Sequence, residues 1–281
     1  MLLVIDVGNT NTVIGLYQGE RLAHHFRIVT KRQTTADEVG ELILSLVERR
    51  GFDPSEIEGA ILASVVPPLN RLFAEAFTHL LGKAPIIVGP GVKTGMPLLV
   101  DNPAELGADR IANAVAGWAR WQQACVIVDF GTGTNIDVVN AKGEYLGGAI
   151  APGLELSMDA LFARAAKLAR VELKQPERAI GKNTNQALQS GLLFGYAGLV
   201  DALVDRMRDE LGTPAKVLAT GGLAFLFEGV SRTLETYDEF LTLDGLRILY
   251  NLNQGALDGT VKMRAVDKRA ADKRAAPTKR N

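Results

Sequence analysis

The chain has 281 residues, which is too long for one typical domain and comfortable for two. Its formal net charge of -1 provides no overall basic field, so nucleic acid is not an expected partner. Apolar runs such as Ala60–Val66 are far shorter than the roughly 20 residues of a membrane helix, and the first residues lack signal-peptide features. We therefore expect a cytoplasmic protein without membrane contact. The single cysteine, Cys125, lies in an apolar run and is expected to be an inert core thiol.

Strands and helices alternate along the chain, which predicts an α/β fold. A helix is expected after Thr35, because apolar residues recur there with a period of 3.6 and because Thr35 and Glu38 have capping-box spacing. The elements expected in the first half are a strand (2–7), a hairpin (12–28), a helix (35–50), a strand (60–66) and two helices (67–81 and 103–121). Those expected in the second half are a strand (125–129), a hairpin (135–150), two helices (154–168 and 184–211), a strand (216–219), a helix starting near Leu223 and a last helix (243–255).

The second half of the sequence repeats the first. Val-Ile-Asp-Val-Gly-Asn-Thr at 4–10 is echoed by Ile-Val-Asp-Phe-Gly-Thr-Gly-Thr at 127–134. Each copy precedes a hairpin whose turn reads Gly-Glu, at 19–20 and at 143–144. One such motif arises easily by chance, whereas two in matching context indicate duplication. We predict two duplicated α/β domains, 1–122 and 123–262, with mixed sheets facing a shared cleft.

The last 19 residues have a different composition. Residues 263–281 contain seven Lys or Arg and no large aliphatic residue beyond Val266 and Met263. Such a segment buries too little apolar area to offset its ordering entropy. We expect a disordered basic tail.

The two Asp/Gly/Thr turns carry groups that bind phosphate. Glycines let backbone N–H groups approach phosphate oxygens, Thr and Asn side chains add donors, and an aspartate can hold a cation. Either turn alone is better explained as an ordinary hairpin turn, but the pair favours phosphate binding. Neither turn is a Walker A loop or a dinucleotide-binding glycine motif. The residues concerned are Asp6, Gly8, Asn9, Thr10, Asn11 and Thr12 in the first turn, and Asp129, Gly131, Thr132, Gly133 and Thr134 in the second.

A third glycine motif, Thr220-Gly221-Gly222, follows the predicted strand 216–219. Two glycines at a strand–helix junction let a flat ring lie against the backbone, although such glycines are also common for purely structural reasons. Two phosphate turns followed by a late Gly-Gly is the order found in the actin, sugar-kinase and chaperone ATPase superfamily. The sequence resembles that superfamily, which implies two actin-like ATPase (ribonuclease H-like) domains around a nucleotide cleft.

Asp109 and Arg110 lie in the early turns of the predicted helix 103–121. A carboxylate there can accept a proton from an attacking hydroxyl, and the arginine can hold a substrate carboxylate or a phosphoryl oxygen. The alternative is an exposed Asp/Arg pair on a solvated helix face.

Several blocks together resemble the type III pantothenate kinase family. The blocks are Asp6–Asn11, Asp101–Pro103 with Gly107–Arg110, Gly147–Gly153, and Gly181–Thr184 with Ser190-Gly191. Ser64–Pro68 and Thr220–Ala224 agree with the same family. The resemblance implies an ATP-dependent kinase that phosphorylates the primary hydroxyl of pantothenate, in the first step of coenzyme A biosynthesis. It also implies a homodimer that uses Mg²⁺ with ATP and a monovalent cation, potassium or ammonium.

The resemblance also implies roles for particular residues. Asp109 would be the catalytic base and Asp129 the ligand of the monovalent cation. Pantothenate would be contacted by Gly107, Ala108, Asp109, Arg110 and Thr184. ATP would be contacted by Asp6, Val7, Gly8, Asn9, Thr10, Asn11, Thr12, Val13 and Thr132.

Two positions depart from the family pattern. The second turn usually reads Gly-Thr-Ala-Thr-Thr, and here Gly133 and Asn135 replace the alanine and the last threonine. A tyrosine often precedes the Asp-Asn-Pro block, where this chain has Val100. The departures at 100 and 135 keep open a kinase for another small alcohol. A non-catalytic nucleotide-binding regulatory protein of the same fold is a separate alternative.

Overall fold

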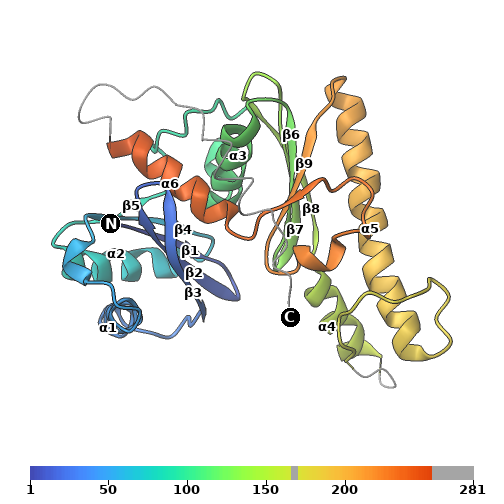
Figure 1. Ribbon diagram of the computed structural model, residues 1–281, viewed down its shortest axis with the longest axis horizontal. Helices are drawn as coiled ribbons and strands as arrows, with labels where there is room; N and C mark the ends of the chain where they lie inside the picture. Colours follow the sequence, from blue (N-terminus) through green and yellow to red (C-terminus); the bar gives the residue numbers. More distant parts are fainter. Residues whose placement is uncertain (166–169, 255–281) are drawn as a thin grey trace. The chain divides into compact units, whose positions relative to one another are not determined.

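The structure is a computed structural model that describes residues 1–165 and 170–254 (Figure 1). The tail predicted over 263–281 lies outside the described residues. The described chain forms two compact units. The first comprises residues 1–96, 101–116 and 241–254, and the second comprises residues 97–100, 117–165 and 170–240. The domains predicted from the sequence, 1–122 and 123–262, have a single division after residue 122. The two compact units are divided differently, because the last described helix belongs to the first unit. The domain limits stay a prediction.

The first unit is built on a five-stranded mixed sheet in the order β3-β2-β1-β4-β5. Strands β1, β2 and β3 are antiparallel neighbours, whereas β4 and β5 extend the sheet in parallel. The strands are β1 (Leu2–Val7), β2 (Asn11–Gln18), β3 (Arg21–Val29), β4 (Gly59–Ser64) and β5 (Ile86–Ile87). The helices are α1 (Ala36–Glu48), η1 (Pro54–Glu56), α2 (Pro67–Leu81) and α6 (Leu241–Gln254).

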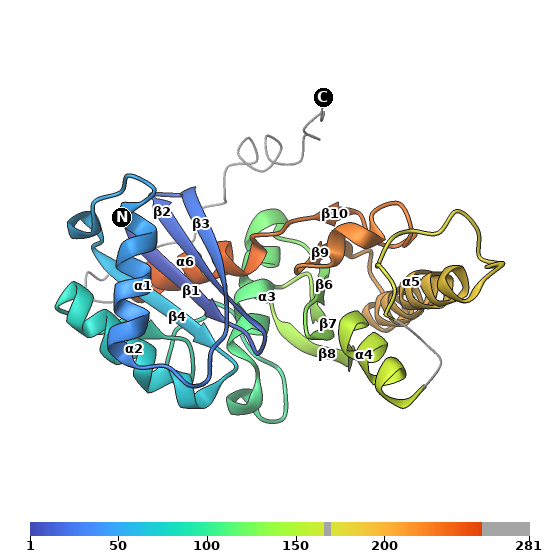
Figure 2. The ribbon, with the colours of Figure 1, turned by 90° about the horizontal axis from the view of Figure 1, so that it is seen from below.

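The core of the first unit lies between its sheet and helices α1 and α2 (Figure 2). Leu3 and Ile5 of β1 pack in one cluster with Ile43 of α1 and Phe73 of α2. Strand residues alternate between faces, so Val4 points to the opposite side, where α6 contacts β1, β2 and β4. Helix α1 starts with the predicted capping box. The Glu38 N–H donates to the Thr35 hydroxyl over 3.2 Å, and the Thr35 N–H donates to the Glu38 carboxylate over 2.8 Å.

The second unit has a sheet in the order β10-β9-β6-β7-β8. Its strands are β6 (Cys125–Phe130), β7 (Gly133–Val139), β8 (Tyr145–Pro152), β9 (Lys216–Thr220) and β10 (Thr236–Tyr237). Helix α5 (Thr184–Leu211) packs its fully buried Leu193, Val200 and Val204 against the apolar side chains of β6 and β7. The other helical segments in the described part of the chain are η2 (Pro103–Glu105), α3 (Ala108–Trp121), α4 (Leu154–Arg164) and η3 (Ala224–Phe227). Cys125 is buried, and that burial raises the pKa of its thiol to about 12, as expected of an inert core cysteine.

The two sheets have the same topology when β1 to β5 are matched with β6 to β10 in order. In each sheet the second and third strands form a hairpin, and the fourth pairs in parallel with the first. Each hairpin also has a register shift at the same place, between Leu16 and Tyr17 and between Val138 and Val139. The predicted α/β fold with two duplicated mixed sheets is therefore confirmed.

Some elements differ from the sequence prediction. The helix expected over 103–121 is divided into the short turn η2 and helix α3, with Gly107 just before α3. The helix expected near Leu223 is only the four-residue η3, because Glu228 is extended and Gly229 has a φ of 72°. Strands β5 and β10 have two residues each, too few for a hydrophobic period to be recognised.

Within the described residues, α5 is long and apolar enough to cross a membrane by length and composition alone, with a mean hydropathy of 1.4 over 18 residues. The sequence reading missed this property because Asp201, Tyr196 and several glycines interrupt its apolar runs. Core helices of soluble proteins have the same property, and the residues of α5 named above are buried against the sheet. The composition of α5 therefore does not distinguish a membrane-spanning helix from the core helix of a soluble protein.

Candidate active site

The first phosphate turn joins β1 to β2 in the first unit. The Gly8 N–H donates to the Asn11 carbonyl over 3.0 Å and closes the turn. Thr30, the residue after β3, holds the turn from the side. Its N–H donates to the Thr10 carbonyl over 2.9 Å, and its hydroxyl donates to the Gly8 carbonyl over 2.8 Å. Asn9 and Thr10 at the tip are exposed, so the predicted donors face solvent on a turn with a fixed backbone.

The flanking residues of that turn belong to the sheet. Asp6 is the penultimate residue of β1, opposite Val13 of β2 and Ala63 of β4. Thr12 is buried, and its hydroxyl lies 2.9 Å from the Thr30 hydroxyl. The structure thus brings the predicted ATP residues of the first unit, Asp6 to Val13, together at one end of β1 and β2.

The second phosphate turn joins β6 to β7 in the second unit. The Gly131 N–H donates to the Gly133 carbonyl over 3.0 Å. The Thr132 carbonyl accepts from the Gly153 N–H over 3.1 Å, so the N-cap residue of α4 touches the turn. Asp129 lies one residue from the end of β6, between Asn135 of β7 and Thr220 of β9.

The Thr220-Gly221-Gly222 motif packs directly on the second turn. Gly221 has a φ of 92°, and a Cβ on it would lie 2.5 Å from Oδ1 of Asp129. The Leu223 N–H also donates to the Phe130 carbonyl over 3.4 Å. Only a glycine fits between the Asp129 carboxylate and this loop. The cation-binding candidate and the glycine pair therefore form one local structure.

Asp109 lies in the first turn of α3. Its Oδ1 accepts from the Arg110 N–H over 2.8 Å, and the Ile111 N–H donates to the Gly107 carbonyl over 3.1 Å. A Cβ on Gly107 would lie 2.5 Å from Oδ1 of Asp109, so the glycine makes room for the carboxylate. Burial raises the pKa of the Asp109 carboxyl, while the Arg110 backbone N–H and guanidinium oppose that rise. Both side chains are half-buried, which differs from the alternative of an exposed pair on a solvated face.

Thr184 is the first residue of α5, and it is exposed. Asn183 caps the helix, since its side chain accepts from the Gln186 N–H over 2.9 Å. The Lys182 N–H donates to the Gln186 side chain over 2.9 Å. The Gly181–Thr184 block is therefore the N-terminal cap of α5, and Lys182 belongs to that cap.

The residues suited to a cation are few. Among the residues that the structure describes, no group of three or more His, Cys, Asp or Glu side chains could hold a metal ion. Asp129 instead offers one carboxylate among the backbone groups of Gly131 and Gly221. One carboxylate beside neutral backbone groups suits a weakly held cation better than a transition metal.

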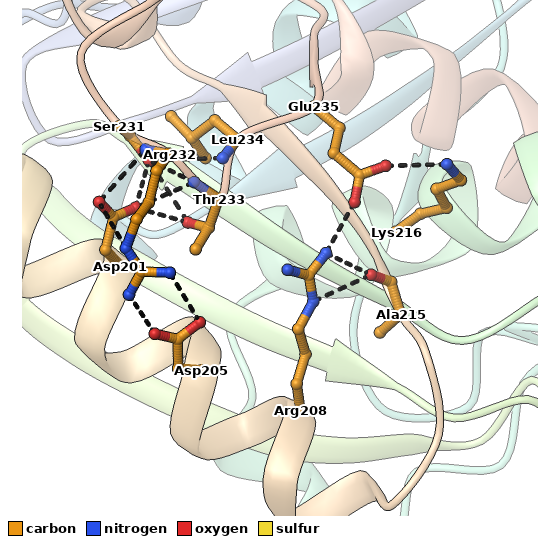
Figure 3. Close-up of polar contacts among 10 residues, drawn as sticks. All are labelled: Asp201, Asp205, Arg208, Ala215, Lys216, Ser231, Arg232, Thr233, Leu234 and Glu235. Atoms are coloured by element: carbon orange, nitrogen blue, oxygen red, sulfur yellow. Dashed lines mark hydrogen bonds and ion pairs between the residues drawn. The ribbon is translucent and has the colours of Figure 1, made fainter.

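A polar network holds the segment between η3 and β10 against α5 (Figure 3). The buried Asp201 carboxylate accepts from the Ser231 hydroxyl over 2.6 Å, the Thr233 hydroxyl over 2.7 Å and the Thr233 N–H over 3.1 Å. Arg232 pairs with Asp205 on the next turn of α5. The network fixes the approach to β10, the strand beside β9 and its glycine motif.

Sequence reasoning missed Thr30 and the contact between Gly153 and Thr132. Thr30 follows a predicted hairpin strand, and its polar neighbours offer no reason to single it out. Gly153 ends a block shared with the resembled family, but nothing in that block predicts that it touches the second turn. Both contacts join residues at least 20 positions apart, so they depend on the hairpin register.

Two mixed sheets of one strand order, each with an Asp/Gly/Thr turn after its central strand, form the actin-like (ribonuclease H-like) fold. A crystal structure titled as a conserved putative Baf family transcriptional activator from Campylobacter jejuni has a TM-score of 0.58 and 20% identity, covering 90% of this chain and 99% of that one. A putative N-acetylglucosamine kinase from Porphyromonas gingivalis has a TM-score of 0.52 and 14% identity, covering 90% and 100%. These likenesses concern the fold.

The sequence comparisons are more specific. Residues 2–206 match the family model of type III pantothenate kinase. A protein of that name from an Anaeromyxobacter species is 54% identical over 254 residues, covering 90% of this chain and all 100% of the relative. Another, from Syntrophotalea carbinolica, is 52% identical over 255 residues, covering 91% and 100%. The chain belongs to the type III pantothenate kinase family, and its class of enzyme is therefore a kinase that uses ATP with a divalent metal.

Proposed function

We propose that this protein transfers the γ-phosphoryl group of ATP to the primary hydroxyl of pantothenate, giving 4'-phosphopantothenate and ADP in coenzyme A biosynthesis. The observation that carries the proposal is Asp109 on the first turn of α3, half-buried and with Gly107 leaving space for its carboxylate. Membership of the family and the two phosphate turns support it. A cytoplasmic location goes with this metabolic role.

In the proposed reaction the hydroxyl oxygen of pantothenate bonds to the γ-phosphorus, and the bond from that phosphorus to the β,γ-bridging oxygen breaks. Asp109 takes the hydroxyl proton, because its raised pKa makes it a better proton acceptor than an ordinary aspartate. Arg110 holds the pantothenate carboxylate, with Gly107, Ala108 and Thr184 as further contacts. These residues would place the acceptor and take its proton, while the metal ion that accompanies ATP would neutralise charge, since phosphoryl transfer depends largely on positioning and charge neutralisation.

The nucleotide is proposed to bind to both turns. Asp6 to Val13 of the first unit and Thr132 of the second would contact ATP. Support comes from the backbone bonds that fix each turn while its tip stays polar. Mg²⁺ would accompany the ATP phosphates and supply electrostatic stabilisation of the transferred group.

The monovalent cation is assigned to Asp129, with potassium or ammonium as the ion. A carboxylate beside neutral backbone groups supports this assignment. We expect activity to depend on potassium and to be lower in sodium alone. Initial rates at constant ionic strength in the two salts measure this dependence, and equal rates would exclude a selective site.

A homodimer is also proposed from family membership, and light scattering of the purified chain tests it.

The decisive experiment is a panel of acceptor alcohols with purified protein, ATP, magnesium and potassium. We expect turnover of pantothenate and little turnover of other small alcohols. Turnover of another alcohol without pantothenate would identify a kinase of different specificity. ATP binding without any acceptor turnover would favour a nucleotide-binding regulatory protein.

A further inference from the structure

Tyr196, in the middle of α5, contacts the start of α4 through its hydroxyl group. The hydroxyl donates to the Pro152 carbonyl over 2.9 Å and lies 3.2 Å from the Gly153 carbonyl. The Ser157 hydroxyl, on the first turn of α4, lies within hydrogen-bonding distance of the Tyr196 hydroxyl oxygen. Tyr196 thus joins α5 to the last residue of β8 and the N-terminus of α4.

The same peptide group also contacts the second phosphate turn. The Pro152 carbonyl and the Gly153 N–H are the two polar ends of one planar peptide. Tyr196 donates to its carbonyl, while its N–H donates to the Thr132 carbonyl over 3.1 Å. Hydrogen bonds in such a chain polarise one another, so loss of the first weakens the second.

The contact between that peptide and the turn leaves no space for adjustment. A Cβ on Gly153 would lie 2.1 Å from the Thr132 carbonyl oxygen and 2.7 Å from the Gly131 carbonyl oxygen. Movement of the Pro152–Gly153 peptide therefore moves the backbone of the turn. The helix that supplies Tyr196 begins at Thr184, about 18 Å away along α5 at 1.5 Å per residue.

We propose that Tyr196 is a positioning residue for ATP binding, which acts through the Pro152–Gly153 peptide to hold the turn Gly131–Gly133 in its phosphate-binding shape. This inference rests on the proposed function, because it takes that turn as part of the ATP site. It also gives α5 two roles, since Thr184 at its start is proposed to contact pantothenate and Tyr196 supports the nucleotide side. No residue of the turn needs to touch Tyr196 for the effect to arise.

The test compares Tyr196→Phe with the full-length wild type. The variant keeps the ring and removes only the hydroxyl, and one hydrogen bond is typically worth about 2- to 12-fold in an equilibrium constant. We expect the Kd for a non-hydrolysable ATP analogue, measured by calorimetry without acceptor, to rise about fivefold. KM for ATP should rise in parallel, while KM for pantothenate changes less than about twofold.

Tyr250→Phe on α6 is the matched control, because it removes a hydroxyl from a helix of the first unit. It should leave the Kd for the analogue unchanged. Loss of thermal stability in Tyr196→Phe with an unchanged Kd would overturn the proposal, since the hydroxyl would then be purely structural. An equal rise in both KM values would overturn it too. Absence of pantothenate turnover in the wild type would refute the substrate assignment alone, whereas a wild type that binds no ATP analogue would refute both.

Discussion

The two phosphate turns are held by the same backbone bond but by different side chains. In each unit the residue after the third strand donates its N–H to the threonine carbonyl of the turn, from Thr30 to Thr10 over 2.9 Å and from Gly153 to Thr132 over 3.1 Å. Thr30 adds a hydroxyl that donates to Gly8. Gly153 has no side chain, and its peptide is supported by Tyr196 from α5.

This difference separates the support that both phosphate turns receive from the backbone from the support that each receives from its own side chains. The backbone bond follows from the shared hairpin register, so both copies have it. The first turn is supported from the neighbouring strand of its own sheet, because Thr30 directly follows β3. The second needs close packing with α4 and the support of α5, and is therefore the turn more sensitive to remote substitution.

The largest effect on kcat is expected from a comparison of two helices whose first-turn aspartates have different hydrogen-bond partners. Helices α3 and α6 each have an aspartate in the first turn, Asp109 and Asp244. The Asp244 carboxylate accepts from the Tyr17 hydroxyl over 2.6 Å, whereas Asp109 accepts from its neighbour's backbone N–H. Asp109→Asn should lower kcat by about 10²- to 10⁴-fold in steady-state kinetics, with KM for ATP little changed.

The matched control is Asp244→Asn, which makes the same chemical change. It should lower the melting temperature, because a charge-assisted bond to Tyr17 weakens, and leave kcat within about threefold. Since burial raises the pKa of Asp109, the rate of the wild type should begin to fall, as pH drops, above the ordinary aspartate value of about 3.9. Near-normal kcat in Asp109→Asn would show that Asp109 is not the base.

A smaller but still large effect is expected from Gly153→Ala. The new methyl group would overlap the Thr132 carbonyl oxygen, and overpacking of this kind costs about 1–3 kcal/mol, so the Kd for an ATP analogue should rise about 5- to 160-fold. Gly198→Ala on α5 is the control, because nothing lies within 4 Å of its added methyl. Calorimetry on both variants measures the difference; an unchanged Kd in a folded Gly153→Ala protein would mean that the second turn does not bind ATP.

Thr30→Val tests the support of the first turn. The substitution keeps the backbone bond to Thr10 and removes the hydroxyl that donates to Gly8, so KM for ATP should rise about 3- to 10-fold. Thr78→Val on α2 is the control, since its hydroxyl donates to the Ala74 carbonyl in the same helix. Equal values of KM in the two variants would mean that the hydroxyl of Thr30 is dispensable.

The local features of the fold were predictable because they depend on neighbours in the sequence. The repeat around Asp6 and Asp129 predicted the two central strands and hairpins, and Thr35 with Glu38 predicted the cap of α1. Helix α5 spans the residues 184–211 that its pattern predicted. The sequence did not reveal contacts between residues far apart in the chain, such as the hydrogen bond from Thr30 to Thr10. It also did not reveal that α6, late in the chain, packs in the first unit. Periodicity contains no information on either.

The crossovers between the fourth and fifth strands also differ between the units. In the first unit α2 connects β4 to β5 and buries Leu69, Phe73 and Phe77, so the connection is held by apolar packing. In the second unit the corresponding connection contains only η3 and the segment that Asp201 binds (Figure 3). Apolar packing is insensitive to pH, whereas a carboxylate network is not.

Asp201→Asn should therefore make stability less dependent on pH, with the smallest effect on catalysis of the four substitutions. Burial opposes ionisation of Asp201, but hydrogen bonds from Ser231, Thr233 and the Arg232 backbone outweigh it and hold the pKa below its usual value. A depressed pKa contributes stability that is present above the unfolded-state pKa and is lost as pH falls through the folded-state pKa. In urea unfolding, the advantage of the wild type over the variant should be full near neutral pH and should shrink in acid. Asp205→Asn, which alters a more exposed ion pair with Arg232, should show a much smaller difference at every pH. A constant gap between wild type and Asp201→Asn across the acid range would show that this carboxylate does not ionise differently in the folded chain.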